Sequence, residues 1–165
     1  MSASSRTRRR SAIALTAVLA LSLSVAPAAS ASAATSVSCT GTTQAAVQKR
    51  VLADVNAARK AKGKKPLTLN ASMSKVAVAW STKQAAANRM SHNPKYSSQI
   101  PAGWTRAAEN VAFGYTPAKV TPAWMKSTGH RANILGSYNR IGIGVACSKR
   151  GLPFYTQVFG SYPAR

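Results

Sequence analysis

The sequence predicts an α+β domain in which two helices come first and an antiparallel hairpin comes last. Three patterns carry this prediction. Apolar residues recur every three or four positions in residues 44–62 and again in residues 70–87, as they do on one face of a helix. Near the C-terminus, apolar residues alternate with glycines over residues 141–147, as in a strand.

A secretory signal precedes this domain. Residues 1–10 carry four arginines, residues 12–26 are apolar, and Ala-x-Ala patterns follow at 29–31 and 31–33. The apolar run is too short to span a bilayer comfortably, so we expect no membrane anchor. We expect cleavage near Ala33 by the general secretory route, because no Phe-Leu-Lys follows Arg8–Arg10 to favour twin-arginine export. The expected organisation is a signal peptide (1–33), an N-terminal segment (34–43) and one domain (44–165) of a secreted, extracellular protein.

The two cysteines of the chain are Cys39 and Cys147. Disulfides persist in the compartments to which exported proteins are sent, and the cysteine count is even. We therefore predict a Cys39–Cys147 bridge, with two free buried thiols as the alternative.

The first predicted helix covers Gln44–Lys62 and ends at Gly63. Its apolar stripe consists of Val47, Val51, Val55 and Ala58. A basic run, Arg59 to Lys65, falls where the helix ends, and we expect it to be a solvated turn that the helix dipole favours. The second helix begins after Asn70 as N-cap and ends before Pro94, with one face formed by Met73, Val76, Ala77, Trp80, Gln84 and Ala87.

The middle of the chain gives weaker signals. Residues 103–114 read as a helical turn that runs into a short extended piece. A third helix, opened by Thr116-Pro117 and ending at Ser127, contains Pro122, so it either starts late, at Thr121, or is kinked. The hairpin then pairs residues 141–147 with residues 154–159 through a turn at 148–151.

Charge is the strongest compositional signal. Four of the 23 Lys and Arg residues lie in the signal, which leaves 19 against two acids, Asp54 and Glu109, a balance of +17. Such a field favours anionic partners, and we expect a cell-wall polymer or a phospholipid surface. Specific nucleic-acid binding is not expected, because aromatic residues are not interleaved with the basic ones.

Few residues have side chains suited to catalysis or metal binding. The candidates are His92, Glu109 and His130. Each has an ordinary structural explanation when taken alone, such as a helix cap or an ion pair with an arginine. No pair of them has the i, i+4 spacing of a helical metal motif.

The order of five motifs resembles a bacterial domain of the CAP superfamily (cysteine-rich secretory protein, antigen 5 and pathogenesis-related 1), also called the SCP domain. The motifs are Ser-His-Asn at 91–93, Glu-Asn-Val-Ala at 109–112, the run from Trp124 to Leu135, Ile-Gly-Ile-Gly-Val-Ala at 141–146 and Tyr-Thr-Gln-Val-Phe-Gly at 155–160. The resemblance covers about residues 44–160. It implies an α-β-α sandwich, with a small antiparallel sheet between helical layers and a central cavity.

Carried onto this chain, the resemblance places His92, Glu109 and His130 in the cavity, and Asn110, Ser127 and Gln157 beside them. Members with a full metal-binding set carry a second Glu where this chain has Ser127. They also carry a His where it has Phe154.

Two imidazoles and one carboxylate can still hold Zn²⁺ with water in the fourth position. The alternative is a hydrogen-bonded network of His92, Glu109 and His130 that braces the cavity.

We expect a secreted, monomeric binding domain held at an anionic surface, and the resemblance implies that its ligand is a lipid or another amphipathic molecule. Two alternatives remain open: an extracellular signalling or host-interaction protein, and a metal-assisted hydrolase with Glu109 as the catalytic base. An enzyme is the less expected of these, because the chain offers no spare carboxylate and no recognisable nucleophile elbow. One scaffold supports several activities, so the fold alone does not choose among them.

Overall fold

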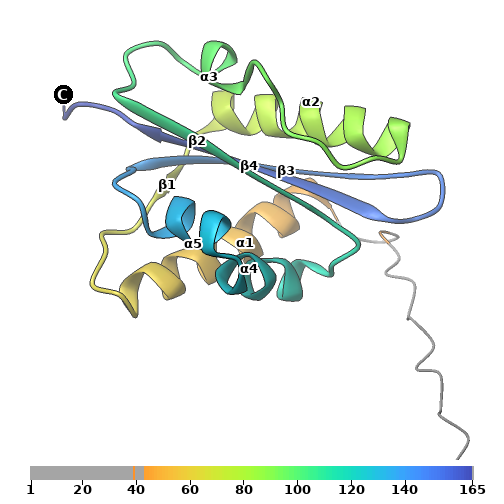
Figure 1. Cartoon of the computed structure of the whole chain (residues 1–165), viewed down its shortest axis with the longest axis horizontal. Coiled ribbons are helices and arrows are strands. Elements are labelled where there is room, and N and C mark those ends of the chain that lie inside the picture. The colour runs from red at the N-terminus through yellow and green to blue at the C-terminus, as the bar shows by residue number, and fades with distance from the viewer. Residues whose placement is uncertain (1–38, 40–42, 165) are drawn as a thin grey trace, which may run out of the picture. The chain divides into compact units, whose positions relative to one another are not determined.

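The computed structural model describes Cys39 and residues 43–164. The predicted signal peptide and most of the 34–43 segment lie outside these residues. The described chain forms a four-stranded sheet between two helical layers (Figure 1). The predicted α+β class and the implied sandwich are confirmed.

The sheet is mixed. Strand β4 (Pro153–Ser161) runs antiparallel to β3 (Arg140–Cys147) and to β2 (Arg106–Phe113). Strand β1 (Thr68–Leu69) pairs with β3 in parallel, so the expectation of a purely antiparallel sheet is corrected. The predicted hairpin is confirmed as β3 and β4. The order across the sheet is β1 (Thr68–Leu69), β3 (Arg140–Cys147), β4 (Pro153–Ser161) and β2 (Arg106–Phe113).

Strand β2 corrects the prediction for residues 103–114. It is an eight-residue strand at the edge of the sheet, and no helical turn opens it; the single-turn helix α3 (Tyr96–Gln99) lies further upstream. Five consecutive residues from Ala108 to Ala112 are buried. Both faces of β2 are therefore covered, which removes the alternation of apolar and polar residues that marks a half-exposed strand.

Helix α2 (Ala71–Ala87) covers one face of the sheet (Figure 1). Asn70 caps it as predicted, because its side chain accepts a hydrogen bond from the N–H of Met73 (2.9 Å). The helix ends at Asn88, whose left-handed backbone (φ 46°) stops it before Pro94. The predicted stripe is only partly right: Ala87 is exposed, Val76 and Trp80 are half-buried, and the buried residues are Met73, Ser74, Ala77, Ser81, Gln84 and Ala85.

Two glycines of β3 let α2 lie close to the sheet. A Cβ on Gly142 would overlap the backbone of Met73, and one on Gly144 would overlap the backbone of Ala77 and Val78. The glycines that alternate with Ile141 and Ile143 thus mark the side of the strand that faces α2.

The other face of the sheet is covered by α1 (Gln44–Lys60), α4 (Pro117–Lys126) and α5 (Thr128–Leu135) (Figure 1). Val47, Val51 and Val55 of α1 are buried as predicted, whereas Ala58 is half-buried. Helix α4 begins at Pro117, so the late start at Thr121 is wrong, and Pro122 falls inside the helix on its exposed side. Helix α5, which no sequence pattern predicted, follows directly.

Arg59 corrects the view of the basic run as a solvated turn. Its side chain is buried (2% exposed), while Lys60 to Lys65 are exposed as predicted. Burial lowers the pKa of the Arg59 guanidinium, which nevertheless keeps its charge near neutral pH. The guanidinium donates to the carbonyl oxygens of Lys65 (2.8 Å), Ile134 (2.7 Å), Gly136 (2.9 Å) and Tyr138 (3.3 Å).

The predicted disulfide is confirmed. Cys39 and Cys147 are bonded, with their Cα atoms 5.9 Å apart, so the alternative of two free thiols is wrong. The bond ties the segment before α1 to the end of β3. Among the residues that the structure describes, no helix has the length and apolar character needed to cross a bilayer.

Candidate functional site

Strand β2 carries both Glu109 and Asn110, and its geometry separates them. Successive side chains of a strand point to opposite faces of the sheet. The hydrogen bonds follow this rule: Glu109 contacts the segment between α2 and α3, whereas Asn110 contacts α5 on the other face. The predicted cavity residues are therefore divided between two sides of the sheet.

On the α2 side, Glu109 pairs with His92. Its Oε1 accepts from His92 Nδ1 (2.8 Å) and from the backbone N–H of Asn93 (2.9 Å), while Oε2 is buried without a hydrogen-bond partner. The Glu109 side chain is 2% exposed, whereas that of His92 is 62% exposed. Burial raises the pKa of Glu109, and the hydrogen bonds from Asn93 and His92 oppose that rise. His92 lies beyond α2, in the loop, rather than at the end of the helix.

On the α5 side, Asn110 is the centre of an amide cluster. Its Nδ2 donates to Gln157 Oε1 (3.2 Å), directly across the β2–β4 pair, and to the backbone oxygen of His130 (3.1 Å). Its Oδ1 accepts from Asn133 Nδ2 (2.9 Å), a residue that the sequence analysis did not single out although it lies in the motif from Trp124 to Leu135. Asn110 and Gln157 are fully buried. Asn110 and Gln157, which the resemblance implies to lie beside the cavity, here form a buried hydrogen-bonded network and do not line an open surface. Their role at a site stays a prediction.

The free edge of β2 is closed by side-chain donors. The carbonyl oxygens of alternate residues point away from β4. Those of Ala107, Glu109 and Val111 accept from Tyr96 Oη (3.4 Å), Asn133 Nδ2 (3.1 Å) and Trp124 Nε1 (3.0 Å), respectively. These bonds hold α3, α5 and α4 against the edge and leave no row of free carbonyls on which another strand can pair.

Beside this edge lies a groove of about 360 Å³, formed by β2, the segment after α2, and helices α4 and α5. Met90 (43%), Phe113 (47%) and Tyr115 (42%), which line it, are three of the four exposed large apolar side chains in the described chain. The full lining is Met90, Val111, Ala112, Phe113, Tyr115, Ala123, Trp124, Ser127 and His130.

Ser127 and His130 supply the polar groups of this groove, so two of the six predicted residues line it. Burial lowers the pKa of His130, and the nearby positive charge of His92 lowers it further.

Zinc is the cofactor that the resemblance implies, and the residues do not fit it in this arrangement. Glu109 and His92 meet on the α2 side, whereas His130 belongs to α5 on the opposite face. In the part of the chain that the structure describes, no group of three or more His, Cys, Asp or Glu side chains is placed to hold a metal ion. Zinc binding stays a prediction that this geometry does not support, and we derive no chemical step through a metal.

Two other hollows are larger but hold none of the predicted residues. One, of about 520 Å³, lies between α1 and α2 beside Gln44 and Lys75. The other, of about 680 Å³, lies near Asn70 and Tyr162. The groove beside β2 is the candidate site because exposed apolar residues and two predicted residues meet there.

Similar proteins agree with this architecture. Over 109 residues the chain is 38% identical to the protein YkwD of Bacillus subtilis (strain 168), an alignment that covers 61% of this chain and 42% of that protein, so the chain spans less than half of its relative's length. The fold resembles an outer surface protein of Borrelia burgdorferi, with a TM-score of 0.65 at 17% identity, covering 71% of this chain and 93% of the other. It also resembles an extracellular protein with an SCP domain from Bacillus anthracis str. Ames, with a TM-score of 0.57 at 24% identity, covering 72% and 41%.

Residues 52–159 match the family described as "CAP: Cysteine-rich secretory protein family". The matched span contains all the helices except the first turns of α1, and almost all of the sheet. The chain therefore belongs to the CAP (cysteine-rich secretory protein) family.

Proposed function

We propose that this chain is an exported CAP-domain protein that binds an amphipathic lipid with a single acyl chain in the groove beside β2. The observation that carries the proposal is the groove itself, where Met90, Phe113 and Tyr115 expose apolar surface beside Ser127 and His130. Ligand sites combine mostly apolar walls with a few polar groups that orient the ligand.

The size of the groove favours a narrow ligand. Its volume of about 360 Å³ is near the lower limit of ordinary ligand pockets, which is about 300 Å³. One acyl chain suits such a space better than two chains or a fused ring system. Each methylene removed from water contributes about 0.8 kcal/mol, so a partly enclosed chain gains substantial affinity.

Export is supported by two features of the chain. The Cys39–Cys147 bond is of a kind that persists in oxidising compartments outside the cytosol. The arginine-rich and apolar pattern of residues 1–26, followed by Ala-x-Ala, is that of a secretory signal. The similar protein from Bacillus anthracis is described as extracellular.

A hydrolase with Glu109 as its base has weaker support. Glu109 does not line the groove, and its Oε1 already accepts two hydrogen bonds. A general base must lie within hydrogen-bond reach of the proton that it removes. The signalling or host-interaction role stays a prediction.

Binding of palmitate, lysophosphatidylcholine and cholesterol to the mature protein would test the proposal. Trp124, which lines the groove, offers an intrinsic fluorescence signal, and calorimetry gives the affinity. We expect the two single-chain lipids to bind and cholesterol not to bind. The variant Ala123→Phe fills the groove and should weaken binding by about tenfold or more, equivalent to about 1.4 kcal/mol.

The matched control is Ala86→Phe, which adds the same group at an exposed position of α2 outside the groove. It should bind like the wild type. The proposal fails if no single-chain lipid binds, or if Ala123→Phe and Ala86→Phe bind equally well.

A further inference from the structure

One end of the sheet gathers exposed apolar and basic side chains from three segments. Strand β2 ends here at Phe113, and the turn between β3 and β4 lies beside it. The N–H of Gly114 donates to Pro153 O (2.8 Å), and the rings of Phe113 and Phe154 stack with centroids 5.6 Å apart. Tyr155 Oη donates to Tyr115 O (2.8 Å), which fixes the next aromatic residue at the same end.

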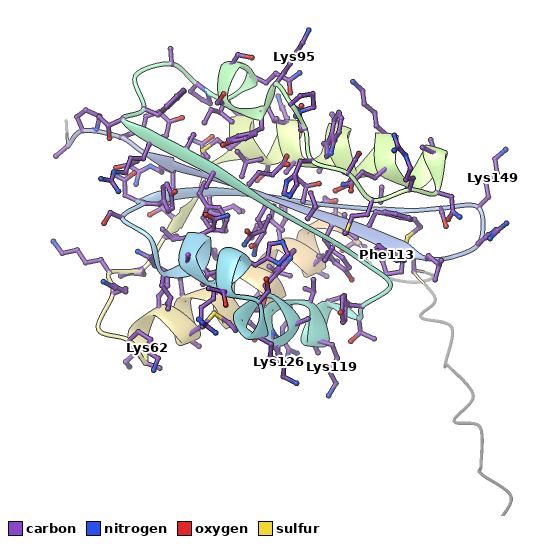
Figure 2. The ribbon with its side chains drawn as sticks, viewed as in Figure 1. Lys62, Lys95, Phe113, Lys119, Lys126 and Lys149 are labelled. Carbon is purple, nitrogen blue, oxygen red and sulfur yellow. A yellow bond between two sulfur atoms is a disulfide. The ribbon has the colours of Figure 1, made fainter. Side chains whose placement is uncertain are left out.

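The segment after α2 completes this surface. Met90 lines the same groove as Phe113 and Tyr115, and Arg89 precedes it in the chain. Lys149 and Arg150 are exposed in the β3–β4 turn. Figure 2 shows Lys149, at the tip of the turn, and Phe113 at this end of the sheet, with Lys62 at the opposite end. We call this surface the sheet-end patch: Arg89, Met90, Phe113, Tyr115, Lys149 and Arg150.

On the described surface, no carboxylate lies free to pair with the basic residues of the patch. Only two acidic side chains occur in the whole sequence. Glu109 is buried, and Asp54 on α1 bonds Arg50 Nε at 2.8 Å. Because no carboxylate neutralises Lys149 and Arg150, their charge acts outward on an approaching partner.

We propose that the sheet-end patch docks this protein on a membrane of anionic phospholipid. Aromatic and large apolar side chains favour the boundary between head groups and acyl chains, while neighbouring Lys and Arg residues attract anionic head groups. A purely charged polymer would interact with the lysines and arginines but would leave the exposed apolar surface of Met90, Phe113 and Tyr115 in water. The patch shares Met90, Phe113 and Tyr115 with the groove, but docking requires no ligand inside the groove and adds the basic residues of the β3–β4 turn.

Flotation with vesicles tests whether the basic residues of the sheet-end patch, and not the positive charge of the molecule as a whole, attract the protein to an anionic membrane. The vesicles contain phosphatidylglycerol and phosphatidylcholine in equal parts, or phosphatidylcholine alone. The double variant Lys149→Gln and Arg150→Gln should bind the anionic vesicles roughly 30-fold more weakly, because each basic residue at an anionic surface contributes about a factor of five. Its groove residues are unchanged, so lipid binding in the groove should persist.

The control is Lys62→Gln with Lys64→Gln, which removes the same charge at the opposite end. These two substitutions should change vesicle binding little, because charges more than about 8 Å from the membrane surface are screened near physiological ionic strength. Equal losses for both pairs, or equal binding to vesicles without phosphatidylglycerol, would overturn the proposal. The proposal would also be overturned if the Lys149→Gln and Arg150→Gln variant lost binding to a wall polyanion but kept its binding to vesicles.

The apolar part has its own test. Phe113→Ser with Tyr115→Ser should abolish most vesicle binding, whereas Trp104→Ser, at an exposed position in the loop before β2, should not. A separate reporter, Phe113→Trp, should be quenched by brominated acyl chains to a greater extent than the wild type, whose own tryptophans include Trp124 in the groove. The added quenching shows insertion without removing apolar surface. Full binding by the serine variant, or quenching of the reporter no greater than that of the wild type, contradicts insertion at this patch.

Discussion

Arg59 places a guanidinium inside the protein, where it joins three segments. Its donors bind the carbonyl oxygens of Lys65, before β1, and of Ile134 and Gly136, at the end of α5. A cation at the carboxyl end of a helix is favoured by the helix dipole, here that of α5. The side chain therefore acts as a structural connector, although the surrounding lysines are exposed.

Replacing Arg59 with Met should destabilise the protein. The substitution preserves apolar bulk but leaves a buried carbonyl, that of Ile134, and several partly buried ones without a donor. A buried unsatisfied group costs about 1–3 kcal/mol, so we expect the free energy of unfolding in urea to fall by about 3 kcal/mol. Arg59→Lys should lose less, because an ammonium reaches fewer of the carbonyls. Lys60→Gln, an exposed neighbour, should change stability by no more than about 0.5 kcal/mol; a similar effect at both positions would contradict the connector role.

Glu109 should make stability depend on pH in a direction opposite to that of most carboxyl groups. Its pKa is raised above the ordinary 4.5 by burial, so the folded state holds a proton that the unfolded state has already lost. Stability contributed by this group therefore falls as pH rises from 4.5 through the raised pKa. Glu109→Gln removes that slope.

Urea unfolding at constant ionic strength checks this sign. The free energy of unfolding of the wild type, minus that of Glu109→Gln, should fall as pH rises from 4.5 to the raised pKa of Glu109 and should be constant at higher pH. A difference that rises with pH would mean that the hydrogen bonds from His92 and Asn93 outweigh the cost of burial.

At the scale of elements, the close contact between α2 and β3 depends on Gly142 and Gly144. Gly144→Ala directs a methyl group at the backbone of Ala77 and Val78, and backbone cannot move aside as a flexible side chain does. Overpacking of a core costs about 1–3 kcal/mol, and we expect a loss at the upper end of this range, measured as the free energy of unfolding.

Gly129 in α5 provides the matched control for this prediction. A Cβ there meets no atom within 4 Å, and Ala is favoured over Gly in a helix by about 1 kcal/mol. Gly129→Ala should thus be neutral or stabilising. Equal effects of the two substitutions would show that α2 does not pack against β3 in the way described.

The elements that the sequence predicted well share a visible period. Helices α1 and α2 bury one face and expose the other, so their apolar residues repeat about every 3.6 residues. Both faces of the β3–β4 hairpin are covered, but in β3 the isoleucines alternate with the glycines that face α2, which gives a visible period of two. Strand β2 is covered on both faces and contains small and polar residues, so it lacks that signal. Strand β1 has two residues, too few for any period.

The candidate site was predicted only in part for the same reason. Without β2 as a strand, the alternation that sends Glu109 and Asn110 to opposite faces cannot be applied. Nothing in the sequence then corrects the resemblance, which groups His92, Glu109 and His130 in one cavity. The groove residues Met90 and Tyr115 carry no motif; their exposure is a tertiary property. Arg59 did have a usable signal, because it continues the spacing of four that links Val47, Val51 and Val55.

At the scale of the whole molecule, charge and cross-linking oppose each other. Without the predicted signal peptide the chain has a formal charge balance of +17, and the two acids are both engaged within the fold. Self-repulsion destabilises a compact state of high net charge. The Cys39–Cys147 bond acts against this, because it keeps the unfolded chain from expanding freely.

Replacing both cysteines with serine should therefore lower the free energy of unfolding. The bonded residues are separated by 108 positions, and closing a loop of that length contributes up to about 4–5 kcal/mol in the chain-entropy description. The loss should be larger at low salt than at high salt, since an unlinked cationic chain relieves its repulsion by expanding, and salt screens that repulsion. Urea is the suitable denaturant because it is uncharged. The reduced wild type should behave like the double serine variant at each salt concentration, and a wild type whose stability is unchanged by reduction would show that the bond does not restrain the unfolded chain in this way.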